Sequence, residues 1–434
     1  MSINFFKGHP TRSLLPAKEI AHSYNKVLLE SNYLAYDTDY DNQHPLAYGT
    51  DPGNLEVRDV IASWVNKKFN IHSTRGDLIN LTSGASYGIA NLLTSVTSLA
   101  ITRRAFIVTP TYFLINNAFV DVGLGDRLTA INETAGDEYE IDLNALEKEL
   151  IKYSSDLEQI SENMTITNDP RGERKLYSFV LYLVPTFSNP GGTTYSLKTR
   201  LKLLELARKF DLLIISDDVY EYLDYSNDDD GAVTSVHVPI PKISQLDQQT
   251  VRNKYGNSIS NATFSKIIAP GLRCGWQESA TPALVQQLSV TGANKSGGTP
   301  AQLATLVVAE MIKTGELDTI IENFVSVYKE RAHVLKLCVE KYLPENTKVY
   351  GGDGGYFFWI ELPHNVDNQS VIHELAKKGV ILAGGENFEV YGDKRGWGDH
   401  CVRLSISYLT TDEIQRGIKQ WGETITEVGK LTKS

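Results

Sequence analysis

A lysine among apolar residues is the side chain with the clearest chemical potential in this sequence. Lys266 follows a run of residues that could end a strand, and a Pro-Gly pair turns the chain soon afterwards. Apolar surroundings remove part of the hydration of an ammonium group, which lowers its pKa and frees the amine to attack a carbonyl. Thr263, Ser265 and Arg273 add two hydroxyls and a guanidinium, which together match a phosphate dianion. The segment therefore predicts a site for an aldehyde that carries a phosphate.

The stretch 261–276 also resembles a known active-site signature. It is similar to the pattern Ser/Thr-x-Ser-Lys, a short loop, Pro-Gly and Arg-x-Gly of fold-type I pyridoxal 5'-phosphate (PLP) aminotransferases. The most similar branch holds the 2-aminoadipate and kynurenine aminotransferases. The resemblance implies that Lys266 binds the aldehyde of PLP and moves the α-proton of the substrate. It also implies that Thr263, Ser265 and Arg273 bind the cofactor.

A second segment predicts a cradle for the phosphate. Residues 81–89 read as a strand end that turns into a helix, and backbone amides at a helix start bind anions. By resemblance, Gly84, Ala85 and Ser86 are the phosphate loop of the family. Ala85 stands where a hydroxyl residue is common and Ser86 where glutamine is common. We therefore expect the loss of one side-chain contact to the phosphate, while the amides remain.

Tyr48 belongs to a Tyr-Gly-x-x-x-Gly element that precedes an expected helix over 55–69. In the family this tyrosine reaches into the site of the neighbouring subunit and bonds the cofactor phosphate. The resemblance thus implies a homodimer with shared sites, to which Thr299 could also contribute. The alternative is a tyrosine that simply packs in a Pro/Gly loop.

Three apolar runs of strand length, 106–108, 180–184 and 212–215, are each followed by polar or aromatic residues. In an open α/β sheet, ligands bind outside the carboxyl ends of the strands. By resemblance, Tyr112 stacks on the pyridine ring of PLP, and Asn189 and Tyr220 bond the ring hydroxyl. Asp217 lies under the ring nitrogen and keeps it protonated, so that the ring accepts negative charge. A turn-capping role for the Asp-Asp pair fits Asp218 better than Asp217.

By resemblance, the last motif, Cys-Val-Arg-Leu-Ser, places Arg403 where the family binds the α-carboxylate of the substrate, and Asn189 is a second substrate-binding residue. A guanidinium fork suits a carboxylate, whereas a lysine offers only a point charge. The expected fold is α/β, with a large domain of mostly parallel sheet flanked by helices and a smaller α+β domain. The expected boundaries are 1–45 for a segment that joins the small domain, 46–305 for the PLP-binding domain and 306–434 for the small domain.

The composition of the chain indicates the class of protein and its cellular compartment. The 434 residues are 41% hydrophobic with a net charge of -11, the balance of a soluble globular protein without a basic stripe for nucleic acid. Three scattered cysteines offer neither a disulfide framework nor a CxxC metal site. No stretch reaches the roughly 18 apolar residues of a membrane helix. The first eighteen residues faintly resemble a transit peptide, but 5–10 resembles the opening segment of the family. We therefore expect a cytoplasmic enzyme without a metal.

The predicted function is transfer of an amino group from an L-amino acid, such as 2-aminoadipate or an aromatic one, to a 2-oxo acid such as 2-oxoglutarate. The same residues would serve another PLP reaction, such as β-elimination or decarboxylation. A PLP-binding regulator is expected to carry a DNA-binding domain before this part, and a non-catalytic scaffold to lack Lys266 or Asp217. Two insertions are expected to be surface loops without chemistry. They are 153–175, a polar segment for which we expect some helix, and 224–257 with its acidic run at 227–231.

Overall fold

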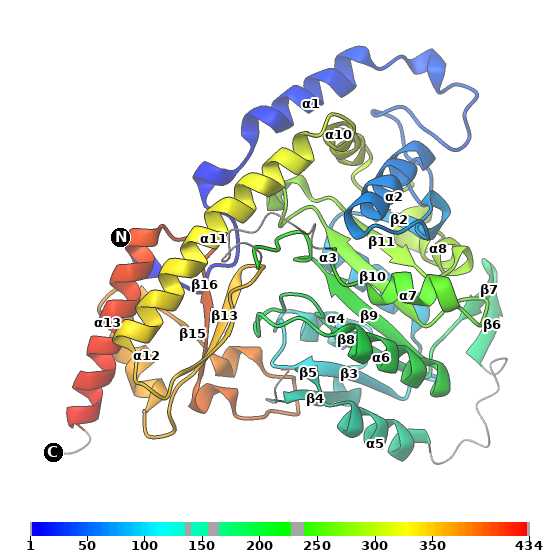
Figure 1. Cartoon of the computed structure of the whole chain (residues 1–434). Helices are drawn as coiled ribbons and strands as arrows, with labels where there is room; N and C mark the ends of the chain where they lie inside the picture. Colours follow the sequence, from blue (N-terminus) through cyan, green and yellow to red (C-terminus); the bar gives the residue numbers. More distant parts are fainter. Residues whose placement is uncertain (1, 135–139, 155–164, 227–237, 432–434) are drawn as a thin grey trace.

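The computed structural model describes residues 2–134, 140–154, 165–226 and 238–431, and its centre is an eight-stranded sheet (Figure 1). The five strands from β10 to β4 run parallel, whereas β2, β11 and β5 lie antiparallel to their neighbours. In spatial order the strands are β2 (Ile79–Thr82), β11 (Gly275–Ser279), β10 (Ser258–Thr263), β9 (Leu212–Asp218), β8 (Phe179–Leu183), β3 (Arg104–Thr109), β4 (Leu128–Thr134) and β5 (Glu140–Ile141).

Helices cover both faces of this sheet because its central strands are apolar on both sides. Ile107 packs in one cluster with apolar residues of α3 and α4, whereas Phe106 and Val108 pack in another with α5, α6 and α7. This alternation follows from the two-residue period of a strand. The helices are α3 (Ala85–Val96), α4 (Ile115–Asp121), α5 (Leu143–Ser154), α6 (Leu197–Lys209), α7 (Ile243–Thr250), α8 (Pro282–Ser289) and α9 (Gly292–Lys295).

A second, antiparallel sheet lies to the left in Figure 1 and is covered by C-terminal helices. Its strands, in spatial order, are β12 (Lys348–Gly351), β13 (Phe357–Glu361), β16 (Cys401–Ser405) and β15 (Ala383–Gly384). The short β1 (Ile3–Asn4) pairs in parallel with β14 (Val380–Ile381), so the start of the chain lies beside this sheet. The helices here are α11 (Glu316–Tyr342), α12 (Asn368–Lys377) and α13 (Thr411–Leu431).

The remaining helices are α1 (Ala17–Glu30), α2 (Leu55–Phe69) and α10 (Gln302–Lys313), and α10 packs against both others. After α10 the chain continues into the longer α11. Gly315 lies between them with a φ of 79°, a left-handed conformation that favours glycine. Among the described residues, no helix combines the length and the apolar character needed to cross a membrane.

The two insertions contain more regular structure than the sequence indicated. The first one ends in an antiparallel hairpin of β6 (Ile166–Asp169) and β7 (Gly172–Lys175), which turns at a glycine with a φ of 109°. The second contains α7, whose Ile243 and Leu246 are buried against the large sheet. The expectation of loops is therefore wrong for these segments, and the acidic run at 227–231 lies outside the described residues.

Candidate active site

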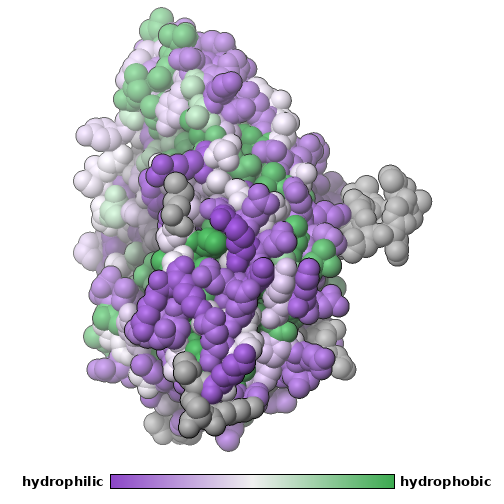
Figure 2. All heavy atoms as spheres, turned by 90° about the vertical axis from the view of Figure 1, so that its left-hand side faces the viewer, coloured by the Kyte–Doolittle hydropathy of each residue, from purple (hydrophilic) through white to green (hydrophobic). Residues whose placement is uncertain are grey.

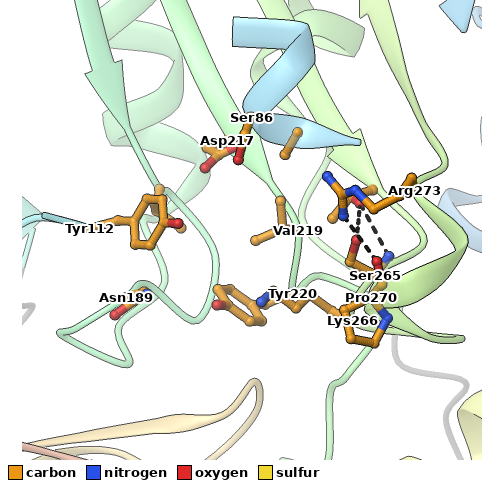
Figure 3. Close-up of a pocket in the computed structure, with 13 residues that line it drawn as sticks. Ser86, Tyr112, Asn189, Asp217, Val219, Tyr220, Ser265, Lys266, Pro270 and Arg273 are labelled. Atoms are coloured by element: carbon orange, nitrogen blue, oxygen red, sulfur yellow. Dashed lines mark hydrogen bonds between the residues drawn. The ribbon is translucent and has the colours of Figure 1, made fainter. Parts of the chain in front are cut away.

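A cavity of about 200 Å³ lies where the parallel strands of the large sheet end. It is lined by ten of the predicted site residues together with Val184, Val219 and Pro270 (Figure 3). In that view Tyr112, Asn189 and Tyr220 lie on one side, and Ser265, Lys266 and Arg273 on the other. The ten are Ala85, Ser86, Tyr112, Asn189, Asp217, Tyr220, Thr263, Ser265, Lys266 and Arg273.

Lys266 follows β10 and its amine is poorly solvated. Loss of hydration lowers its pKa to about 8, and the positive charges of Arg403 and Arg273 act in the same direction, while Asp217 opposes them. The amine Nζ donates a long hydrogen bond of 3.4 Å to the carbonyl oxygen of Gly8. About a tenth of this amine is thus unprotonated at pH 7 and about half at pH 8, which supplies the free amine that attack on an aldehyde requires.

Asp217 is buried near the end of β9 and carries a donor on each carboxylate oxygen. The Tyr182 hydroxyl donates to Oδ2 at 2.7 Å, and Asn261 Nδ2 donates to Oδ1 at 2.8 Å. Burial raises the pKa of Asp217 to about 6, and these two hydrogen bonds oppose the rise. Asp218 points to the other face of the sheet and accepts a bond of 2.8 Å from Ser216 Oγ, so it lies in the strand and caps no turn.

The start of α3 forms a concave, cationic surface beside Arg273. Gly84 has a φ of 96°, a conformation that favours glycine, and a Cβ there would lie 2.9 Å from Arg273 Nη2. Ala85 and Ser86 follow as the first helical residues, whose N–H groups have no partner within a helix. Arg273 is oriented by bonds to the carbonyl oxygens of Ser83 and Pro270, at 3.1 and 3.0 Å.

The hydroxyls beside Lys266 are ordered by a local hydrogen-bond pair. Thr263 Oγ1 donates to Ser265 Oγ at 2.9 Å and accepts from the Ser265 amide at 3.1 Å. Both side chains line the cavity on the side of Arg273. Two hydroxyls, a guanidinium and the amides of a helix start fit a phosphate group, and the lysine amine fits the aldehyde of the same molecule. The residues present therefore fit PLP.

Arg403 is buried in β16 and held from two sides. Its Nη1 donates to Asn189 Oδ1 at 2.9 Å, and its Nη2 donates to the Phe6 carbonyl oxygen at 2.5 Å. The rings of Phe6, Phe357 and Phe388 lie 4.2 to 5.4 Å from the guanidinium carbon. Burial lowers the pKa of Arg403 to about 10, which leaves it cationic at neutral pH. Its Nε has no hydrogen-bond partner among the described residues.

The two predicted dimer contacts, Tyr48 and Thr299, are not among the residues that line this cavity. The Tyr48 side chain is 82% exposed, so it is not packed in its own chain. Thr299 is buried, and its hydroxyl donates to the Leu81 carbonyl oxygen of the same chain at 3.1 Å.

Several groups that sequence reasoning missed complete the site. Residues 5–9, here called the N-terminal strap, contribute the carbonyl oxygens of Phe6 and Gly8. Tyr182 and Asn261 hold Asp217 from the neighbouring strands β8 and β10. An amide in the middle of a strand is the one sequence signal that could have indicated Asn261. Backbone carbonyls give no such signal, because every residue has one.

Comparison with known proteins agrees with the geometry. The family model described as aminotransferase class I and II matches residues 24–420. An uncharacterised protein of Saccharomyces cerevisiae is 45% identical over 97% of this chain and 96% of its own. Aromatic-amino-acid aminotransferase 1 of Thermococcus litoralis is 29% identical, covering 88% of this chain and 80% of that one.

The crystal structure of Pyrococcus horikoshii kynurenine aminotransferase superposes with a TM-score of 0.75 at 26% identity, covering 98% of this chain and 91% of that one. These matches confirm the predicted family, fold class and cofactor. The chain therefore belongs to the class I and II aminotransferases, PLP-dependent enzymes that transfer an amino group from an amino acid to a 2-oxo acid.

Proposed function

We propose that this enzyme takes an L-amino acid with a large side chain, aromatic or of the 2-aminoadipate type, and passes its amino group to 2-oxoglutarate or a similar 2-oxo acid. The observation that carries the proposal is Arg403, a buried fork with an unpaired Nε and aromatic rings on three sides. Such a fork binds a carboxylate, and the rings offer an apolar surface for a bulky side chain. The named aromatic and kynurenine aminotransferases support the same substrate class.

We assign the steps to residues as follows. Bound PLP supplies the electron sink that makes the α-proton of the substrate acidic. Lys266 would take that proton and deliver it to C4′ of the cofactor, because about half of its amine is unprotonated at a pH near its pKa of about 8. With PLP bound, Asp217 would hold a negative charge against the ring nitrogen, and Tyr220 and Asn189 would bond the ring hydroxyl. Tyr112 would pack on the ring, and Arg403 with Asn189 would fix the substrate carboxylate.

The cofactor phosphate is held, in this proposal, by the start of α3 and by the side chains beside Lys266. The amides of Ala85 and Ser86 bind it after the turn at Gly84. Thr263, Ser265 and Arg273 bind it from the opposite side. The fit rests on the close approach of Gly84 to Arg273 and on the ordered pair of hydroxyls.

The homodimer is the second part of the proposal. Tyr48 belongs to a group of exposed apolar and aromatic residues in the last turn of α1 and the segment after it, a group that a second copy of the chain would cover. Figure 2 shows hydrophobic residues at the top of the molecule, at the height where Figure 1 places α1 and the following loop. The most exposed are Leu29, Leu34, Tyr40, Leu46 and Tyr48. In the dimer Tyr48 would bond the phosphate in the partner's site.

We also propose a cytoplasmic location and the division of the chain at residues 45 and 305. All three cysteines are buried and unpaired, which suits a reducing compartment. The strands of the large sheet all fall between 79 and 279, and those of the second sheet between 348 and 405. The pairing of β1 with β14 supports assigning the first residues to the small domain.

A donor screen tests the substrate proposal. Purified enzyme is given single L-amino acids with 2-oxoglutarate or pyruvate, and the new amino acid and oxo acid are quantified. We expect phenylalanine, tyrosine, kynurenine or 2-aminoadipate to lead the ranking, and Lys266→Ala to abolish product formation. Preference for alanine or aspartate would contradict the substrate class. Release of carbon dioxide or ammonia without a new amino acid would point to decarboxylation or β-elimination instead.

A further inference from the structure

Four polar side chains lie side by side across the large sheet and end at Asp217. Asn80 of β2, Gln277 of β11, Asn261 of β10 and Asp217 of β9 are direct partners in successive strand pairs. The three amide residues are completely buried. Direct partners on neighbouring strands project their side chains on the same face of a sheet. The three amides therefore form a row, here called the amide row, with the carboxylate at its end.

Every hydrogen bond in the amide row runs toward the carboxylate. Asn80 Nδ2 donates to Gln277 Oε1 at 3.4 Å, and Gln277 Nε2 donates to Asn261 Oδ1 at 3.2 Å. Asn261 Nδ2 then donates to Asp217 Oδ1 at 2.8 Å. The reverse orientation of Asn261 would place two acceptors in contact, because an ionised carboxylate has no proton to give. The amide dipoles thus point their positive ends at Asp217, and bonds aligned in this way strengthen one another.

The amide row is also fixed to the first turn of α3. Asn261 Nδ2 lies 3.2 Å from the Ala85 carbonyl oxygen, and Gln277 Nε2 donates to the Gly88 carbonyl oxygen at 2.8 Å. A Cβ at Gly88 would lie 2.4 Å from Asn261 Oδ1, so the helix approaches the amide row as closely as glycine permits. Asn261 therefore connects the helix proposed to bind the phosphate with the carboxylate proposed to face the ring nitrogen.

Stability alone does not explain this arrangement. Asn80 Oδ1 is buried without a hydrogen-bond partner among the described residues, which is a net cost in folding free energy. Apolar side chains at these positions would avoid that cost, as the buried Leu81, Ile259 and Trp276 of the same strands do. A buried polar group that lowers the stability of the fold needs another explanation, and the neighbouring active site offers one.

We propose that Asn261, backed by Gln277 and Asn80, is a positioning residue that keeps Asp217 ionised and correctly oriented for the ring nitrogen of the cofactor. The inference rests on the proposed role of Asp217. Burial raises the pKa of this carboxyl, and the Asn261 and Tyr182 hydrogen bonds lower it. The titratable groups that act on Asp217 from the surrounding elements are Tyr112, Tyr182, Asp218, Tyr220 and Lys266.

The test measures the pKa of Asp217 in the full-length apoprotein, so it does not depend on amino transfer. Aspartate labelled with ¹³C at Cγ is titrated by NMR, and the resonance is assigned with Asp217→Asn. Asn261→Leu should raise the pKa by about 1 to 2 pH units, because a charged hydrogen bond is lost. Gln277→Met should raise it less. In the holoenzyme, ¹⁵N-labelled PLP should show the ring nitrogen losing its proton at lower pH in both variants.

Asn91→Leu is the matched control. Asn91 is a buried amide of α3 that donates to the Leu288 carbonyl oxygen at 3.1 Å, and its hydrogen bonds among the described residues do not include the amide row. This variant should melt at a lower temperature with the pKa of Asp217 unchanged. An unchanged pKa in Asn261→Leu would overturn the proposal, and if that variant fails to fold, an unchanged pKa in Gln277→Met would do so. A raised pKa in an enzyme without transaminase activity would support the amide row and count against the proposed function.

Discussion

Replacing Arg403 by lysine should slow both halves of the transamination by similar factors. A guanidinium has five N–H groups, and two of those on Arg403 are used by Asn189 and the Phe6 carbonyl. Three N–H groups remain, which is enough for a carboxylate that accepts two hydrogen bonds. Lysine has three N–H groups, so after replacing the two existing bonds it keeps only one for the substrate. The substitution thus loses at least one charged hydrogen bond, about 1.5–3 kcal/mol, or about 10- to 150-fold in rate.

The assay follows each half-reaction separately by stopped-flow absorbance, with the amino donor alone and then with the oxo acid alone. Both substrates carry a carboxylate next to the reacting carbon, so one fork must serve both. Arg331→Lys is the matched control, because Arg331 is also buried but binds the carbonyl oxygens of Ile406 and Ser407. A variant at Arg403 that slows only one half-reaction, or neither, would refute the reasoning.

Three further predictions concern the cofactor site and the assembly. Borohydride reduction of the yellow holoenzyme should fix the cofactor on Lys266, and a labelled peptide with another lysine would disprove the assignment. Uptake of PLP by the apoprotein should accelerate as pH rises and level off above about pH 8, because the Lys266 pKa is lowered to about 8 and the free amine increases with pH. A rate that still climbs tenfold per pH unit at pH 9.5 would contradict this pKa. Mixed dimers of Tyr48→Phe and Lys266→Ala chains should regain activity that neither variant has alone, whereas an active monomer in light scattering would exclude shared sites.

Much of the fold and site could be predicted because each site motif directly follows an apolar run of strand length. The expected strands at 106–108, 180–184 and 212–215 are the cores of β3, β8 and β9, and the residues after them do meet at one cavity. Helix α7 escaped prediction because only Ile243 and Leu246 mark its buried face among glutamines. The β6–β7 hairpin is polar on both strands, and contacts distant in sequence, such as Lys175 with Asp211, hold it in place.

The groups that hold Asp217 and Arg403 were harder to predict for a different reason. Asn261 and Gln277 are adjacent only after strands β10 and β11 pair, so their spacing in the sequence carries no pattern. The strap contacts use carbonyl oxygens, which every residue has. Their position depends on the path of the chain beside β16, where the Ser405 amide donates to the Phe5 carbonyl oxygen at 3.0 Å.

The strap carbonyls have a consequence for how the enzyme would be surveyed by mutagenesis. An alanine scan changes side chains and leaves carbonyls in place, so it does not report the Phe6 and Gly8 carbonyls as partners of Arg403 and Lys266. An effect of alanine at Phe6 would reflect the lost ring beside Arg403, and one at Gly8 would reflect a Cβ that lies 2.8 Å from the Phe357 ring. Replacing an amide bond of the strap by an ester, which weakens the carbonyl as an acceptor, would test the carbonyls themselves.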